Sequence, residues 1–268
     1  MLIASGLFFT AGLLATFGSS AAYIWHLLRQ GKAAGRLGVL LTAMAVLFLG
    51  LSLLLRSLVA GHAPFANQYE FSVAFAWGIA AAFLYADRRY GARGLGGIVM
   101  PLAALILAFA STLSAQVDPL IPALQNSLLL TLHVSVAIVA YGTFAVAFGA
   151  AVLYLLGSEK GSLGAERWLL DEIAYRSVMI GFPTMAMVII LGAVWANIAW
   201  GRYWGWDPKE TSSLVTWLVY GGYLHAHGLK GWSGTPSAVL LVLGFVAVLL
   251  TFFGNFFFGG LHSYVGLG

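Results

Sequence analysis

The sequence predicts an all-α protein, a polytopic membrane bundle of about eight transmembrane helices. Of its 268 residues, 61% are hydrophobic and only 8% are charged, whereas soluble domains are about half apolar and a quarter charged. Eight apolar runs are long enough, or nearly so, to cross about 30 Å of hydrocarbon. The runs cover residues 3–28, 37–58, 69–86, 97–114, 127–156, 173–199, 210–228 and 237–258. No large soluble segment interrupts them, so we expect residues 1–268 to form a single integral membrane domain.

The individual runs differ in how clearly they are marked. The run 3–28 is long and lacks a basic segment before it, so it is predicted to be a span and not a cleaved signal peptide. The third, fourth and seventh runs are short. Residues 115–126 contain two prolines and are predicted to form a turn-rich segment at the interface. Residues 162–176 alternate apolar and charged side chains, which predicts an amphipathic helix lying on the cytoplasmic surface.

The basic residues predict the orientation of the bundle. Ten of the 13 Lys and Arg residues follow the odd-numbered spans, and they are Arg29, Lys32, Arg36, Arg88, Arg89, Arg93, Lys160, Arg167, Arg176 and Lys230. The other three, Arg56, Arg202 and Lys209, fall on the opposite side. The positive-inside rule makes the side with ten basic residues cytoplasmic. Both termini and the loop between the sixth and seventh spans are therefore expected to face outward.

That loop contains an unusual cluster of aromatic and charged residues. The stretch 200–210 holds Trp200, Trp204 and Trp206 together with a tyrosine and four charged residues. Such a stretch is typical of an aromatic belt at the membrane interface, or of a flat apolar surface for a ring-shaped ligand. The sequence leaves both interpretations open.

Charged residues on the outer side also have two interpretations. Asp207 and Glu210 have the spacing of a helix N-cap and its third residue, with Pro208 between them. Asn67 and Glu70 share this spacing at the start of the third span. These acids either cap helices or contact a ligand. Arg56, Arg202 and Lys209 either pair with carboxylates of a ligand or anchor the protein at the interface; for Arg56 we favour the anchor.

Any metal ligand must be His, carboxylate or Met, because the chain has no cysteine. The six histidines fall into two groups by predicted depth. The outer group is His62, His133 and His262, and the group near the cytoplasmic ends of spans one and seven is His26, His225 and His227. Ionisable residues in spans are functional candidates, although a single His more often forms a hydrogen bond between helices. His133 and His262 lie on the same side as the Trp-rich loop, and a haem iron commonly takes His as an axial ligand.

The residues Trp200-Gly201-x-x-Trp204-x-Trp206-Asp207-x-x-Glu210 resemble the WWD signature of the haem-handling protein superfamily. Within it, the sequence resembles the CcsA (ResC) family of System II cytochrome c biogenesis. The likeness extends from about residue 60 to the end of the chain. It includes Gly181-Phe182-Pro183, Gly192-Ala193-Val194-Trp195-Ala196, Trp217…Tyr220…Leu224-His225, Asn67-Gln68-Tyr69-Glu70, the His133 segment and Leu261-His262-Ser263-Tyr264.

The resemblance implies a set of site residues and ligands. It implies that haem b is handled as a substrate, with His133 and His262 as axial ligands of an outer haem and His225 as a ligand of an intramembrane haem. Trp200, Trp204, Trp206 and Asp207 would contact the outer haem. The second ligand of the intramembrane haem would be His26 or a residue of a partner.

The resemblance also implies partners and a location. A membrane partner of the CcsB (ResB) type would complete a cytochrome c synthase, and an apocytochrome c would present its Cys-x-x-Cys-His motif. The chain would lie in the plasma membrane as a multi-pass protein, or in the thylakoid membrane of a photosynthetic cell. Lipid contacts are expected and nucleic acid is not. Two alternative functions are a haem exporter or carrier similar to CcmC, without synthase activity, and a bis-haem electron-transfer subunit.

Overall fold

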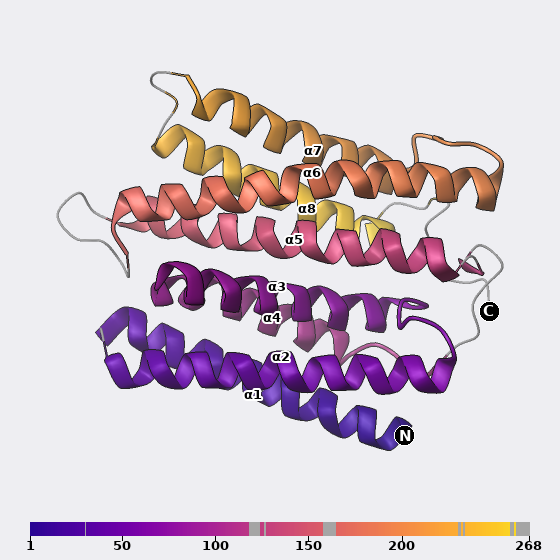
Figure 1. The fold of residues 1–268 in the computed structure, drawn as a ribbon, viewed down its shortest axis with the longest axis horizontal. Helices are drawn as coiled ribbons and strands as arrows, with labels where there is room; N and C mark the ends of the chain where they lie inside the picture. Colours follow the sequence, from indigo (N-terminus) through magenta and orange to yellow (C-terminus); the bar gives the residue numbers. More distant parts are fainter. Residues whose placement is uncertain are drawn as a thin grey trace.

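The chain folds into a bundle of long helices that lie side by side (Figure 1). The computed structural model describes residues 1–29, 31–117, 124–125, 127–157, 165–229, 232, 234–257 and 260. These residues contain a short 3₁₀ helix, η1 (Arg93–Leu95), and eight α-helices. The α-helices are α1 (Leu2–Arg29), α2 (Lys32–Ala60), α3 (Gln68–Tyr90), α4 (Gly96–Ala110), α5 (Ser127–Leu156), α6 (Arg167–Trp200), α7 (Pro208–His227) and α8 (Thr235–Phe257). The prediction of an all-helical bundle with about eight long helices is confirmed.

Seven of these helices are long and apolar enough to span a membrane, and α7 is not among them. α7 has 20 residues, which at 1.5 Å per residue is about 30 Å and sufficient in length. Its composition is more polar, because Lys209, Glu210 and three hydroxyl residues fill its first turns and two histidines lie near its end. α7 packs against α6 and α8, and Figure 1 shows it along the outer edge of the bundle.

α5 connects the two halves of the bundle. It packs against α6 and α8 on one side and against α3 and α4 on the other, whereas α1 packs mainly on α2 and α4. The ring of Phe144 in α5 stacks on that of Tyr220 in α7, with centroids 3.6 Å apart and planes within 4°. α1 and α7 consequently lie on opposite sides of the bundle (Figure 1).

The segment 162–176 does not form a separate surface helix, so that prediction is wrong. From Arg167 onward it is the first part of α6, which continues without a break to Trp200. Its apolar residues Leu170, Ile173 and Ala174 are buried within the protein. The amphipathic pattern therefore reflects packing against neighbouring helices and not against lipid.

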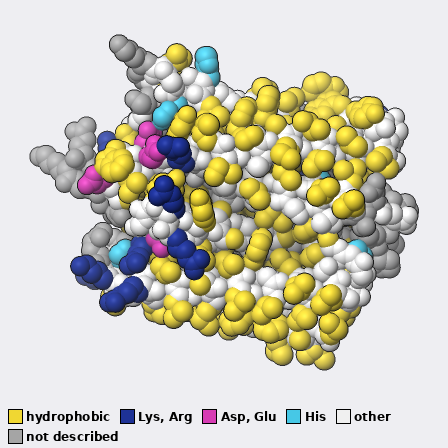
Figure 2. All heavy atoms as spheres, in the orientation of Figure 1, with side chains coloured by type: hydrophobic (Ala, Val, Ile, Leu, Met, Phe, Trp, Pro, Cys, Tyr) yellow, Lys and Arg dark blue, Asp and Glu magenta, His cyan; other side chains and the backbone are white. Residues whose placement is uncertain are grey.

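The two ends of the bundle carry different side chains. At the first, which we call the loop end, residues 201–207 connect α6 to α7, and α1 begins there. At the second, which we call the basic end, Lys and Arg side chains gather beside an otherwise apolar surface (Figure 2). α1 and α3 end there and α2 and α6 begin there (Figure 1), and the described Lys and Arg residues near these termini are Arg29, Lys32, Arg36, Arg88, Arg89, Arg93, Arg167 and Arg176. Lys160 and Lys230, also predicted for this side, lie outside the described residues.

Candidate functional site

The Trp-rich loop is held by the capping interactions that its sequence predicts. α6 ends where Gly201 adopts a left-handed conformation with φ +73°. At the start of α7, Asp207 Oδ1 accepts a hydrogen bond of 2.9 Å from the Lys209 amide. Glu210 Oε2 accepts bonds from the amides of Gly205 at 2.8 Å and Asp207 at 3.1 Å. Asp207 and Glu210 therefore fix the path of the loop, and both are buried.

Trp206 is the exposed tip of this loop. Its φ of +56° is the only positive value at a non-glycine residue in the described part of the chain. A bulky side chain adopts this conformation rarely and at a cost of roughly 1–2 kcal/mol. Its side chain is 69% exposed. The loop thus holds a large indole in the open at the expense of backbone strain, which is a feature of ligand-binding segments.

The three Trp residues of the signature do not form one flat surface. Trp204 and Trp206 meet edge to face, with centroids 5.7 Å apart and planes at 89°. Trp200 lies at the end of α6 and packs on Trp195, with centroids 5.0 Å apart. A planar ligand can therefore lie flat against Trp204 or Trp206, but not against both rings at once.

His133 is connected to this loop by a row of rings. It lies in the second turn of α5, and its imidazole stacks on Trp195 of α6 with centroids 6.4 Å apart and planes within 23°. A Cβ atom at Gly192 would lie 3.0 Å from His133 Cε1, so the absence of a side chain at Gly192 makes room for the imidazole. The rings of His133, Trp195 and Trp200 form this row, and Trp200 is the first residue of the signature stretch. The structure therefore places His133 at the loop end, beside the signature.

The second predicted ligand of the outer haem, His262, lies outside the described residues. Gly260, two positions earlier, is described and lies against the start of α7. A Cβ atom at Gly260 would overlap Asp207 Oδ2 and lie 3.0 Å from Pro208 Cδ. Gly260 therefore lies at the first turn of α7, where the signature ends.

The basic residues of the loop end have different environments. Arg56 is buried, and its Nε donates to Glu70 Oε1 at 2.9 Å. Its two terminal nitrogens donate to the carbonyls of Ala115 and Gln116. Our preference for Arg56 as an interface anchor is therefore wrong, because its charge is neutralised inside the protein. Arg202 is exposed.

Glu70 does more than cap a helix. The Asn67 side chain accepts the Glu70 amide at 3.0 Å, as the spacing predicts. The Glu70 carboxylate also accepts the amide of Ala66 at 2.8 Å, in addition to its bond from Arg56. Glu70 is fully buried, so it ties the loop before α3 to the end of α2.

Lys209 lies in the first turn of α7, before the predicted span begins at residue 210. Its ammonium nitrogen is 5.8 Å from the centre of the Phe71 ring. Burial lowers the pKa of Lys209 to about 8, because the charged form is desolvated, while the Asp207 carboxylate raises this pKa in part.

The histidines at the basic end do not form a pair. His225 is exposed on α7, and His26 lies on α1 across the bundle. The neighbouring His227, to which the sequence gives no role, lies with its Nε2 3.0 Å from Asp171 Oδ2 and its ring stacked on Tyr175. Proximity of the Asp171 and His227 side chains is a tertiary contact that no local pattern predicts. Any second ligand for an iron at His225 would have to come from outside α1.

Comparisons with known proteins agree with this architecture. The family model described as cytochrome C assembly protein matches residues 65–262. The cytochrome c biogenesis protein CcsA of Guillardia theta is 38% identical over 253 residues, covering 83% of each chain. The CcsA protein of Synechocystis sp. is 36% identical over 290 residues, covering 83% of this chain and 86% of that protein.

Among solved structures, the cytochrome c haem lyase CcmF superposes with a TM-score of 0.69 at 18% identity. The match covers 94% of this chain and 46% of CcmF, and it shows a shared fold. Fold and matches define a multi-pass membrane protein of the cytochrome c assembly class. The chain belongs to the cytochrome c assembly family and, within it, to the CcsA proteins. Its function therefore lies in cytochrome c biogenesis.

Proposed function

We propose that the chain is the membrane subunit of a System II cytochrome c synthase that carries haem b to the loop end. His133 and His262 bind the iron as axial ligands, and the loop 200–210 contacts the ring. The observation that carries this proposal is the row from His133 through Trp195 and Trp200 to the signature loop. The contact of Gly260 with Asp207 supports it, because His262 follows two residues later.

We assign the loop end to the extracytoplasmic face. The support is the charge asymmetry, since ten of 13 basic residues belong to the other end by sequence and those that are described gather there (Figure 2). Apocytochrome c would meet the haem on this face. Exposed Trp206 and Tyr203 supply aromatic surface for the haem, and Arg202 and Lys209 supply cations for its propionates.

The chemistry of attachment belongs to the haem and the apocytochrome. Each thiol of the Cys-x-x-Cys-His motif adds across one haem vinyl group. A C–S bond forms at the inner carbon and the proton goes to the terminal carbon, without net oxidation. The motif's His replaces one of the two axial ligands. This chain has no thiol, so its contribution is to position the haem and to exclude other iron ligands, with proximity supplying the rate.

A partner of the CcsB type completes this function. The connections between consecutive helices hold at most 16 residues, so a partner with a larger domain is needed to grip an unfolded apocytochrome. His225 is exposed on α7, and a partner helix lying against it would supply the second ligand of an intramembrane haem.

Reconstitution of the complex separates this function from that of a haem carrier. The purified complex receives reduced haem and a Cys-x-x-Cys-His peptide, and the thioether product is measured by mass spectrometry. We expect product with the wild-type chain and none with His133→Ala. The control is His62→Ala, which changes a histidine at the same end whose Nδ1 lies 2.8 Å from the Ala63 carbonyl. Haem release without product in the wild type would instead indicate a carrier, and transfer of electrons to quinone would indicate an electron-transfer subunit.

A further inference from the structure

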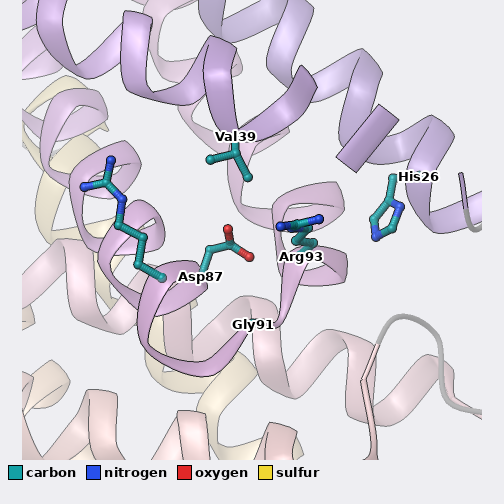
Figure 3. A pocket seen from close by; sticks show the side chains of 6 residues that line it. His26, Val39, Asp87, Gly91 and Arg93 are labelled. Atoms are coloured by element: carbon teal, nitrogen blue, oxygen red, sulfur yellow. The ribbon is translucent and has the colours of Figure 1, made fainter. Parts of the chain in front are cut away.

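The basic end contains a hollow that the haem function does not use. It has a volume of about 480 Å³ and lies among α1, α2 and the turn from α3 to α4 (Figure 3). The residues lining it are His26, Val39, Asp87, Arg88, Gly91 and Arg93. Its volume lies within the range of small-molecule sites. It is separated from the signature loop by the length of the bundle (Figure 1).

Asp87 is the residue of this hollow that most needs a ligand. Figure 3 shows its carboxylate pointing into the space beside Val39 and Arg93. The residue is only 6% exposed, and its Oδ1 is buried with no hydrogen-bond partner. Among the described residues, its carboxylate makes no ion pair within 4.0 Å. A buried carboxylate oxygen without a donor is costly, so a cationic donor in the hollow would stabilise it.

Cationic side chains share the same hollow. Arg88 and Arg93 line it from the two sides of the α3–α4 turn. Arg93 and His26 both approach Gly35 of α2, where a Cβ atom would lie 3.2 Å from Arg93 Cδ and 3.1 Å from His26 Nδ1. The hollow therefore offers two guanidinium groups to an anion and one carboxylate to a cation.

Gly91 lines one side of the hollow. It ends α3 in a left-handed conformation with φ +69°, and its amide donates to the carbonyl oxygen of Asp87 at 2.8 Å. A Cβ atom there would meet no heavy atom within 4 Å. The turn thus leaves free space at this side of the hollow.

We propose that this hollow binds the headgroup of an aminophospholipid. The phosphate contacts Arg88 and Arg93, and the primary ammonium donates to Asp87 in a charge-assisted hydrogen bond. The site lies at the end of the spans, where headgroups are found, and basic pockets between helices at this depth bind phosphorylated headgroups. A haem propionate fits less well, because it would bring a second carboxylate to Asp87.

The test compares three phospholipids that differ in the group next to the phosphate. Full-length wild-type protein is reconstituted into vesicles of equal parts phosphatidylethanolamine, phosphatidylcholine and phosphatidylglycerol. It is then extracted in mild detergent, and the retained lipids are measured by mass spectrometry. We expect phosphatidylethanolamine to be retained roughly ten-fold over phosphatidylcholine, whose quaternary ammonium has no N–H donor. Equal retention of the two, or preferential retention of phosphatidylglycerol, would overturn the proposal.

Three variants assign the preference to the hollow. Asp87→Asn should abolish the preference for phosphatidylethanolamine, and Arg93→Gln should lower retention of all three lipids. Val39→Phe fills the hollow while leaving Asp87 in place. It should also abolish the preference for phosphatidylethanolamine, and it tests the proposal if Asp87→Asn fails to fold. The matched control is Glu172→Gln, which changes a carboxylate at the same end that pairs with Arg176 on the surface. A preference that survives in both Asp87→Asn and Val39→Phe would also overturn the proposal.

Discussion

The loop end and the basic end use charge in opposite ways. At the loop end, the acidic side chains that the structure describes are buried, and each binds backbone amides or a buried cation. Glu70 accepts hydrogen bonds from Arg56 and the Ala66 amide, and Glu210 accepts from the amides of Gly205 and Asp207. At the basic end, the ion pair of Glu172 with Arg176 is largely exposed, while the buried Asp87 has no partner for Oδ1.

The buried carboxylates of the loop end fix its backbone through hydrogen bonds. Glu210 accepts from the amides on either side of Trp206, whose backbone is strained. A binding site for a large planar ligand benefits from such a rigid frame. The basic end instead has exposed cations, which suit contact with lipid headgroups. The following substitutions test this contrast.

The largest effect is expected from Arg56→Ala. It leaves Glu70 buried and uncompensated, so the free energy of unfolding should fall by about 3–5 kcal/mol. Thermal unfolding in detergent, followed by circular dichroism, measures the loss. Replacing both residues, as Arg56→Met with Glu70→Met, should recover much of it, because no unpaired charge remains. If Arg56→Ala is as stable as the wild type, the stability of the loop end does not depend on this pair.

Gly192→Val should disturb His133 directly. The new side chain begins 3.0 Å from His133 Cε1, and overpacking of this kind costs about 1–3 kcal/mol. We expect the haem absorbance of the purified protein to fall by more than the loss of folded protein accounts for. Gly222→Val is the control, since a Cβ atom at Gly222 meets nothing within 4 Å. Equal haem content in the two variants would argue against His133 as a ligand.

Trp206→Asn should separate stability from function. Asparagine tolerates the left-handed conformation better than tryptophan, so the protein should become more stable by up to roughly 1 kcal/mol. Haem retention should nevertheless decrease, because the exposed indole is lost. Unfolding and haem titration on the same preparation measure both quantities. A variant that is less stable but retains haem normally would contradict the account of strain at this loop.

The smallest effect is expected at the basic end. Arg176→Ala breaks an exposed pair with Glu172 of 2.7 Å, and exposed ion pairs contribute little to stability because solvent screens them. The same thermal unfolding assay applies. A loss as large as that of Arg56→Ala would remove the contrast between the two ends.

The sequence predicted the features that depend on local pattern. Hydropathy placed the helices. Capping is confirmed on both sides at Asp207–Glu210, and at Asn67–Glu70 for the Asn67 side chain alone. The sequence did not predict contacts between distant elements. The pair of Arg56 with Glu70, 14 residues away in another helix, is such a contact. Without it, the sequence favours an interface anchor for Arg56. The segment 162–176 has the same pattern whether it packs on lipid or on α5.

The candidate site was predicted in its location but not in its shape. Span order and loop position place His133 on the side of the signature, and the structure agrees. The perpendicular rings of Trp204 and Trp206 depend on backbone angles that the sequence does not specify. The space for His133 at Gly192 is likewise a contact between α5 and α6. Ligation by His133, His262 and His225 stays a prediction.

The spectrum of haem bound to purified protein tests the central claim most directly. The wild type, His133→Ala, His262→Ala and His62→Ala are prepared from the same haem-replete host, and coordination is assigned from absorbance. Two imidazole ligands at the loop end predict a six-coordinate, low-spin spectrum in the wild type and in His62→Ala. They predict loss of haem or a five-coordinate, high-spin spectrum in each of the other two. An unchanged low-spin spectrum in both His133→Ala and His262→Ala would contradict the account.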